Sequence, residues 1–204
     1  MFGKIKAINK GDTVGSLTST QIEILIGSLL GDGTLRKQGT RTNALFEVNH
    51  SLQFSDYVDW KYEFFKEYVK TPPKSRKSNG NRIAYRFTTQ SLPVFTEYYD
   101  KYYSLGKKII PSNIKLTNSI LAVWFMDDGS KTRNSFYINT QQFDIESQLL
   151  LIKCLERDFG IKSTLNSDKQ YKRIRIRTES AKQLKNIVAP FTRPCFYYKL
   201  TMTP

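Results

Sequence analysis

The sequence has few of the residues on which many enzyme and secreted-protein classes depend. It contains two cysteines, Cys154 and Cys195, and one histidine, His50, among 204 residues. These numbers exclude a disulfide scaffold, a cysteine-rich zinc module and a metal cluster built from histidines. A metal site in this chain would therefore use oxygen ligands, and we expect both cysteines to be buried packing residues.

Long apolar runs are also missing. The longest, at residues 24–30 and 120–126, fall far short of the roughly twenty residues that cross a bilayer. No secretory signal is visible in the sequence. We therefore expect no membrane association and a reducing, intracellular setting.

Acidic residues are scarce beside basic ones. The chain has 18 Asp and Glu against 32 Lys and Arg, which gives a formal net charge of +14 at pH 7. Hydrophobic residues make up 39% of the chain and aromatic residues 13%, which argues against disorder. A chain of this length can bury its own core, and its charge predicts a polyanionic partner.

One pattern occurs twice along the chain. An apolar run ends in Asp-Gly at Leu25–Gly33 and again at Leu121–Gly129, and the two aspartates, Asp32 and Asp128, lie 128 − 32 = 96 residues apart. Runs that are apolar on every side predict buried helices. A repeat of this kind predicts two similar halves in tandem.

Helix boundaries are expected at matching places in the two copies. The segment Thr20–Glu23 has the spacing of a capping box, and Thr117–Ser119 supplies the second start signal. Gly33 and Gly129 are expected to stop the two helices.

The elements after each helix repeat as well. Apolar periodicity predicts a strand, a helix, a second strand with one basic face and a final helix, which makes each half α+β. A lysine follows at the end of each half. Lys108 lies 108 − 32 = 76 residues after Asp32, and Lys199 lies 199 − 128 = 71 residues after Asp128. In the first half, the predicted strand, helix and basic strand are 44–48, 55–70 and 82–87, and the final helix opens at 92–93. In the second half they are 136–140, 144–159 and 173–177, and the final helix opens at 180–181.

The aspartate at the end of each apolar helix favours a cation site. A carboxylate there faces the negative end of the helix dipole, which is unfavourable unless a cation binds beside it. The alternative is an ordinary turn, because Asp-Gly is a common turn dipeptide. Two matched copies, Asp32 and Asp128, favour the cation, and hard oxygen ligands suit Mg²⁺.

Both apolar runs resemble the LAGLIDADG motif of homing endonucleases, and Trp124–Gly129 is especially similar to the single-chain, intron-encoded members. The resemblance extends from about residue 20 to residue 202. It implies two pseudo-symmetric αββαββα halves whose curved antiparallel sheets form a saddle over DNA, with the motif helices at the central interface. We expect a basic arm at 1–15, a first half at 16–111 and a second half at 112–204.

The resemblance also implies a metal site. Asp32 and Asp128 would bind divalent metal next to the scissile phosphates, and the backbone carbonyls of Gly31 and Asp127 would point at the metal. Mg²⁺ is the expected cofactor, with Mn²⁺ as an alternative and Ca²⁺ as a non-productive substitute.

Two basic residues complete the implied site. The family's flanking basic residues, which stabilise charge or orient water, map by position onto Lys108 and Lys199. The second motif departs from the family at Val123, where glycine is usual for close helix contact, whereas Gly27 and Gly31 keep a small surface in the first. This departure puts exact symmetry of the helix pair in doubt.

Basic residues in alternating positions predict the DNA-binding surface. Arginines on one face of a strand can contact phosphates and guanine edges, whereas a merely solvated face normally mixes both signs of charge. We expect His50 to be a polar sheet residue that meets DNA, and not a catalytic base. The expected DNA-binding residues are Glu47, Asn49, Lys74, Arg76, Lys77, Arg82 and Arg86 in the first half, and Gln141, Lys172, Arg173, Arg175 and Arg177 in the second.

The resemblance implies a monomeric, site-specific endonuclease that cuts both strands of a long, non-palindromic DNA target with metal assistance. Two alternatives stay open on the same scaffold, because a fold alone does not settle function. One is a maturase that binds its host intron RNA, and the other is a DNA-binding regulator that does not cut. An intron-encoded chain would act in a mitochondrion or chloroplast.

Overall fold

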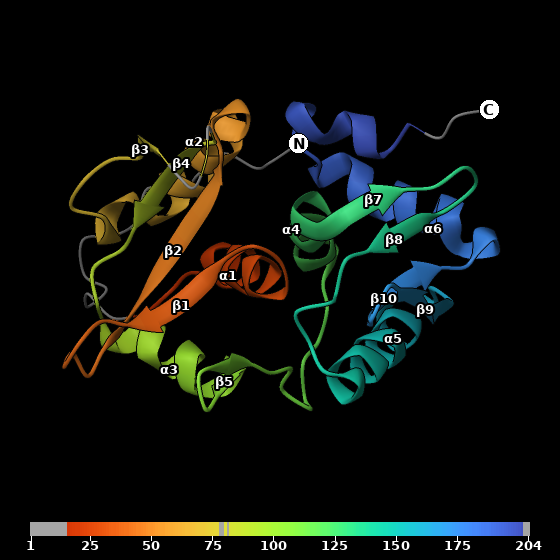
Figure 1. The fold of residues 1–204 in the computed structure, drawn as a ribbon, viewed down its shortest axis with the longest axis horizontal. Helices are drawn as coiled ribbons and strands as arrows, with labels where there is room; N and C mark the ends of the chain where they lie inside the picture. The colour runs from red at the N-terminus through yellow and green to blue at the C-terminus, as the bar shows by residue number, and fades with distance from the viewer. Residues whose placement is uncertain (1–15, 78–79, 81, 202–204) are drawn as a thin grey trace.

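The chain forms two α+β halves with the same order of elements (Figure 1). The computed structural model describes residues 16–77, 80 and 82–201, so the expected basic arm at 1–15 lies outside the described residues. The first half contains α1 Ser19–Leu30, β1 Thr34–Lys37, β2 Ala44–Ser51, α2 Ser55–Phe65, β3 Lys74–Lys77, β4 Ile83–Thr88 and α3 Pro93–Tyr102. The second contains α4 Asn118–Asp128, β7 Gly129–Lys131, β8 Phe136–Ile138, α5 Ile145–Phe159, β9 Ser163–Asp168, β10 Tyr171–Ile176 and α6 Thr178–Val188. The predicted αββαββα halves are confirmed.

Each half has an antiparallel four-stranded sheet of the same topology. The strand orders are β1-β2-β4-β3 and β7-β8-β10-β9. In β2 the residues Phe46 and Val48 are fully buried, and Val48 pairs with the buried Phe87 of β4. Because side chains alternate along a strand, Glu47 and Asn49 lie on the other face of the same sheet. Each sheet therefore has one face in the core and one face free for binding.

The helices α1 and α4 lie side by side in the middle of the molecule and join the two halves (Figure 1). Their contact is asymmetric, because a Cβ added at Gly27 would lie 2.6 Å from the Cβ of Val123. Gly27 thus provides the space that Val123 fills. The departure from glycine at Val123 is compensated by the opposite helix, and the close contact between the helices is kept.

The boundaries of α1 differ from the predicted ones. Its N-cap is Thr18, whose side chain accepts a hydrogen bond from the backbone of Gln21 in a capping box, so the predicted start at 20–23 is two residues late. Gly31 caps its C-terminus, so the prediction that Gly33 stops the helix is wrong. The helix α4 agrees with its prediction, with Thr117 as N-cap and Gly129 as C-cap.

Other predicted segments need small corrections. The helix expected at 55–70 is divided into α2 and a 3-10 turn at Lys66–Tyr68. The strand expected at 136–140 ends at Ile138, and Arg177 is the N-cap of α6 and not a strand residue. Cys154 is buried as expected, while Cys195 is half-buried against the core. Among the described helices, none combines the length and apolar character that a membrane crossing requires.

Candidate active site

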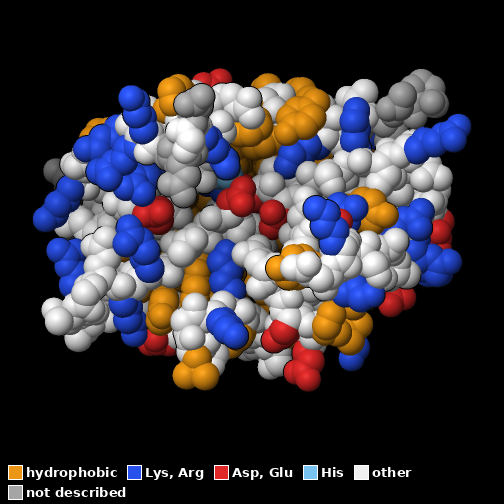
Figure 2. Space-filling view, viewed as in Figure 1, with side chains coloured by type: hydrophobic (Ala, Val, Ile, Leu, Met, Phe, Trp, Pro, Cys, Tyr) orange, Lys and Arg blue, Asp and Glu red, His pale blue; other side chains and the backbone are white. Residues whose placement is uncertain are grey.

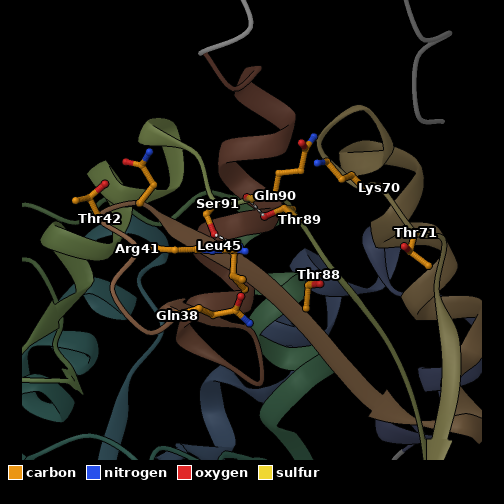
Figure 3. Close-up of a pocket in the computed structure, with 11 residues that line it drawn as sticks. Gln38, Arg41, Thr42, Leu45, Lys70, Thr71, Thr88, Thr89, Gln90 and Ser91 are labelled. Atoms are coloured by element: carbon orange, nitrogen blue, oxygen red, sulfur yellow. Dashed lines mark hydrogen bonds between the residues drawn. The ribbon is translucent and has the colours of Figure 1, made fainter.

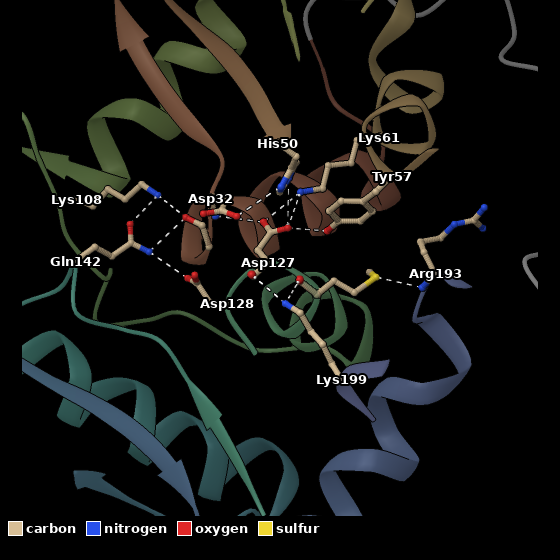
Figure 4. A network of polar contacts seen from close by, with 12 residues as sticks. Asp32, His50, Tyr57, Lys61, Lys108, Asp127, Asp128, Gln142, Arg193 and Lys199 are labelled. Carbon is tan, nitrogen blue, oxygen red and sulfur yellow. Dashed lines mark hydrogen bonds and ion pairs between the residues drawn. The ribbon is translucent and has the colours of Figure 1, made fainter. Parts of the chain in front are cut away.

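Asp32 and Asp128 come together where α1 and α4 end (Figure 4). Asp32 follows the C-cap of α1, and Asp128 is the last residue of α4. Both line one hollow of about 320 Å³. The other residues that line it are Gly31, Thr34, Lys108, Asn139, Gln141 and Gln142.

A third carboxylate, that of Asp127, lies behind this hollow and is completely buried. Tyr57 Oη donates a hydrogen bond of 2.8 Å to its Oδ1, and Lys61 Nζ lies 3.1 Å from both of its oxygens. The side chain of Lys61 is also fully buried. Because a buried charge without a partner is strongly destabilising, this pair can exist only as a unit.

His50 lies next to two of these carboxylates. Its Nδ1 is 3.5 Å from Asp32 Oδ2, and its Nε2 is 3.7 Å from Asp127 Oδ1. Strand alternation places it on the core side of β2, where its ring packs against Tyr57, so the expectation that it meets DNA is wrong. Burial lowers its pKa to about 4, which favours the neutral imidazole.

The two predicted lysines reach the backbone at the ends of the motif helices. Lys108 Nζ donates a hydrogen bond of 2.7 Å to the carbonyl of Gly31. Lys199 Nζ donates to the carbonyls of Met126 and Asp127, at 2.6 and 3.2 Å. These contacts are pseudo-symmetric, since Gly31 and Asp127 precede the two motif aspartates.

Different local structures carry these two lysines. Lys108 ends a short hairpin of β5 Tyr103–Ser104 and β6 Lys107–Lys108, whose two-residue turn has positive φ at Leu105 and Gly106. Positive φ at both turn residues is typical of tight hairpins, and glycine adopts it without strain. Lys199 ends a 3-10 helix at Pro194–Lys199.

The carboxyl groups in the hollow disfavour one another's ionisation. Burial, followed by the charges of Asp32 and Asp127, raises the pKa of Asp128 to about 8. Burial and the charge of Asp127 also raise the pKa of Asp32. Burial lowers the pKa of Lys108 to about 8, and it lowers the pKa of Lys199 as well. The hollow therefore favours a bound cation that would neutralise the carboxylates.

Gln142 connects the two motif ends, and the sequence did not single it out. Its Nε2 lies 3.1 Å from the carbonyl of Leu30, 3.3 Å from that of Gly31 and 3.3 Å from Asp128 Oδ2. Its Oε1 accepts a hydrogen bond from Lys108 Nζ at 3.2 Å. Nothing in the residues around position 142 marks it, because its partners are distant in sequence.

Lys61 and Tyr57 could have been found from a sequence signal. They lie on the buried face of α2 with Val58 and Phe65, at helical spacing. A lysine among apolar residues on the buried side of a helix needs an anionic partner. The sequence therefore contained evidence of a buried charge, although it could not identify Asp127 as the partner.

The free face of the first sheet carries several of the expected DNA-binding residues. Lys74, Arg86 and Asn49 are neighbours across β3, β4 and β2. Glu47 lies between two arginines, 2.8 Å from Arg36 and 3.9 Å from Arg86. Strand alternation places Arg76 on this face and Lys77 on the opposite one, while Arg82 precedes β4.

A polar hollow extends this surface. It has a volume of about 580 Å³ beside the start of β2, and Gln38, Arg41, Thr88 and Gln90 are among the residues that line it (Figure 3). Figure 2 shows Lys and Arg side chains gathered over the region of β2 to β4, with acidic side chains near the middle of the same view. The first half thus presents dense positive charge beside the central acids.

The second sheet has an equivalent basic face. Arg173 lies over the ring of Tyr137, 4.0 Å from its centroid, and it is 3.9 Å from Asp168. Gln141 donates a hydrogen bond of 2.7 Å to the same aspartate. Arg175, the next residue on this face, has a buried Nε without a hydrogen-bond partner.

Two expected members of this surface lie elsewhere. Alternation along β10 places Lys172 on the opposite face from Arg173, and its Nζ donates to Ser167 Oγ at 2.7 Å. Arg177 forms an ion pair of 2.9 Å with Glu179 at the start of α6. The prediction that three arginines share one strand face with Lys172 beside them is therefore wrong at Lys172 and Arg177.

Comparisons with known proteins agree with this geometry. Residues 22–184 match the model of the LAGLIDADG DNA endonuclease family. The chain is 32% identical over 199 residues to "Probable intron-encoded endonuclease 1" of Wickerhamomyces canadensis, with 91% of this chain and 85% of that protein covered. It is 30% identical over 198 residues to "Cytochrome b mRNA maturase bI2" of Debaryomyces hansenii, with 90% and 74% covered.

A solved structure shows the same fold. The homing endonuclease I-WcaI, bound to its DNA recognition sequence, superposes with a TM-score of 0.85 at 27% identity. The match covers 97% of this chain and 96% of that one. It confirms the expected two-half architecture along nearly the whole chain.

Proposed function

Because the chain belongs to the LAGLIDADG DNA endonuclease family, we propose that it is a homing endonuclease that cuts both strands of a long, non-palindromic DNA target. The observation that supports this most directly is the central hollow, to which each half contributes one aspartate. Lys108 lines the hollow, and the buried Lys199 binds the backbone at the end of the second motif helix. Such pairing within one polypeptide needs no second subunit, so the active form is a monomer. The halves differ in sequence, so the target need not be palindromic.

The residues of the hollow fit a divalent metal. Asp32 and Asp128 offer hard oxygen ligands. Burial, followed by the neighbouring carboxylates, raises the pKa of both side chains, and a bound cation would oppose this effect. These two side chains, with the carbonyls of Gly31 and Asp127, would hold the ion. Bound there, Mg²⁺ or Mn²⁺ supplies Lewis acidity and lowers the pKa of water, and Ca²⁺ is the non-productive substitute.

The lysines and Gln142 supply fixed charge and orientation. Lys108 and Lys199 are held against backbone carbonyls on either side of the acids, where their ammonium groups would stabilise the extra negative charge of the phosphate during hydrolysis. A pKa of about 8 allows Lys108 to hold or release a proton near neutral pH. Gln142 fixes Lys108 relative to Asp128.

The two free sheet faces would bind the duplex. Arginines on these faces are suited to phosphates and to guanine edges in the major groove. In the first half Arg36 and Arg86 are oriented by Glu47, and in the second half Arg173 is oriented by Tyr137 and Asp168. Double-stranded DNA is thus the proposed partner.

A second candidate function is that of an intron maturase, favoured by the similarity to a protein named as a cytochrome b mRNA maturase. Its partner would be the RNA of the host intron, which would bind the same basic surface. An intron-encoded chain would act in a mitochondrion or chloroplast. The intact acids of the hollow favour DNA cleavage as the primary activity.

The test is cleavage of the uninterrupted insertion site of the gene. That site is obtained by sequencing the DNA on both sides of the reading frame and joining the two flanks. With Mg²⁺ the protein should linearise a plasmid that carries the joined site and leave a plasmid with the interrupted site uncut. Absence of cleavage at the joined site, or cleavage that persists in excess EDTA, would contradict the proposal.

A further inference from the structure

The two halves differ at one position beside the motif aspartates. Gly31 precedes Asp32, and Asp127 precedes Asp128 at the equivalent place. A Cβ added at Gly31 would contact the Cβ of Asp127 and would lie 2.8 Å from its Oδ2. The side chain of Asp127 therefore fills the space that Gly31 leaves, and only the second half contributes a side chain here.

Groups of the first half fix this carboxylate of the second half. Tyr57 and Lys61, both from α2, bind it at 2.8 and 3.1 Å, and neither side chain is exposed (Figure 4). The aromatic ring of Tyr57 also lies under the ammonium of Lys61, 4.4 Å from it. Asp127 thus has one rigid orientation across the interface between the halves.

The same carboxylate holds the segment that carries Asp32. The backbone N–H of Asp32 donates a hydrogen bond of 3.3 Å to Asp127 Oδ2. Within the described part of the chain, no hydrogen bond from the first half reaches the Asp128 carboxylate. Asp128 ends the helix α4, and its carboxylate contacts Gln142 of its own half. The two motif aspartates are therefore positioned by different means.

A cation shared by Asp32, His50 and Asp127 is the competing explanation for this cluster, since their ligand atoms lie within 4.8 Å of one another. The ammonium of Lys61 already lies 3.1 Å from both oxygens of Asp127 and supplies the positive charge. A metal ion placed here would be repelled by it. The contacts therefore favour a brace, by which we mean the Asp127 carboxylate held by Tyr57 and Lys61 and bonded to the backbone N–H of Asp32.

We propose that Asp127 is a positioning residue that fixes Asp32 across the interface. Because Asp128 is not fixed in this way, the cleavage sites for the two DNA strands differ and the strands are cut at unequal rates. This inference rests on the proposed endonuclease function. In it, Lys61 and Tyr57 hold the Asp127 carboxylate in place. The brace consists of protein groups alone, so it can be measured apart from activity.

The first measurement is amide hydrogen exchange of the metal-free protein. The variant Lys61→Met/Asp127→Ala removes the acceptor and the buried cation together, which avoids leaving an unpaired charge. The amide of Asp32 should exchange at least about tenfold faster in this variant. The matched variant Lys61→Met/Asp127→Asn keeps an acceptor oxygen and should retain the slow exchange.

The second measurement is strand-resolved cleavage. A duplex with a different label on each strand is cut under single-turnover conditions, and the rate constant of each strand is determined. The ratio of the two rate constants should change by about tenfold in the Asp127→Ala double variant, because a small misplacement of one acid affects one centre. Cys154→Ala, which truncates a buried residue of α5 far from the hollow, controls for general destabilisation and should leave the ratio unchanged.

The outcomes separate the two proposals. Unchanged exchange at Asp32, or an equal fall in the rates of both strands, would overturn the role of Asp127. Failure of the wild type to cut either strand would instead contradict the endonuclease function and with it the strand inequality. The exchange data would still decide whether Asp127 braces Asp32.

Discussion

Gly27 of α1 and Val123 of α4 occupy equivalent positions in the two motif helices, and one provides the space that the other fills. A methyl group at position 27 would lie 2.6 Å from Val123 Cβ and 2.9 Å from the carbonyl of Ile120. Real side chains do not approach so closely, so the helices would have to move apart. The contact that joins the halves thus depends on a glycine in one copy only.

We expect Gly27→Ala to destabilise the protein by about 1–3 kcal/mol, the range of overpacked cores. The double variant Gly27→Ala/Val123→Gly moves the missing side chain to the other helix and should recover part of this loss. Urea denaturation of the three proteins measures the effect. Equal stability of Gly27→Ala and wild type would mean that the interface tolerates separation of the helices.

Neutral variants of the motif aspartates test the proposed active site. Asp32→Asn and Asp128→Asn should each reduce double-strand cleavage by at least about a hundredfold, the scale for removing a main stabiliser of the transition state. Both variants should still bind DNA in Ca²⁺, as a gel-shift assay on the same preparations would measure. Efficient linearisation by either variant would show that the hydrolytic site lies elsewhere.

Stability of the metal-free protein should depend on pH through Asp128. Its pKa is about 8 in the folded protein and near the ordinary 3.8 in the unfolded chain. Between these values the folded state binds more protons than the unfolded state, so the free energy of unfolding falls as pH rises. Asp128→Asn has no carboxyl group to titrate at this position, so its free energy of unfolding should rise relative to that of the wild type between pH 5 and pH 8. Urea denaturation in EDTA would measure the difference. A difference that stays constant with pH would argue against the raised pKa.

Two basic residues should separate base recognition from phosphate attraction. Arg175 lies on the free face of the second sheet, and Lys74 is exposed on the free face of the first, on its edge strand β3. Arg175→Ala should reduce discrimination between targets that differ by one base pair. Lys74→Ala should weaken binding to all sequences and reduce the salt dependence of the binding constant by about one released counterion. Competition binding at several salt concentrations provides both numbers. If both variants lose affinity equally on every sequence, Arg175 on strand β10 contacts phosphates and does not recognise bases.

The sequence predicted the features that depend on local pattern and repetition. The two apolar helices follow from continuous hydrophobic runs, and the start of α4 follows from the capping residue Thr117. The start of α1 was misplaced because Thr18 and Thr20 both precede polar residues with capping-box spacing, and local pattern does not choose between them. The strand faces followed from alternation except near strand ends, where Arg177 already caps the next helix.

The brace behind the hollow could not be predicted in the same way. Lys61 and Asp127 are 66 residues apart, and only the packing of α2 against the motif helices brings them together. His50 was expected to face DNA because its neighbours Glu47 and Asn49 are polar. Strand alternation, however, places it on the core side, where the carboxylates of both halves lie.

The asymmetric pairs at the centre of the molecule limit how the chain could be rebuilt. A dimer of two second halves would place Val123 against Val123 and one Asp127 carboxylate against another, while a dimer of two first halves would leave two copies of Lys61 buried without an anion. Neither half is therefore self-complementary, although both have the same topology. A symmetric dimer designed from either half would therefore need new residues at positions 27, 31, 61, 123 and 127, whereas the natural chain joins two unlike, complementary halves in one polypeptide.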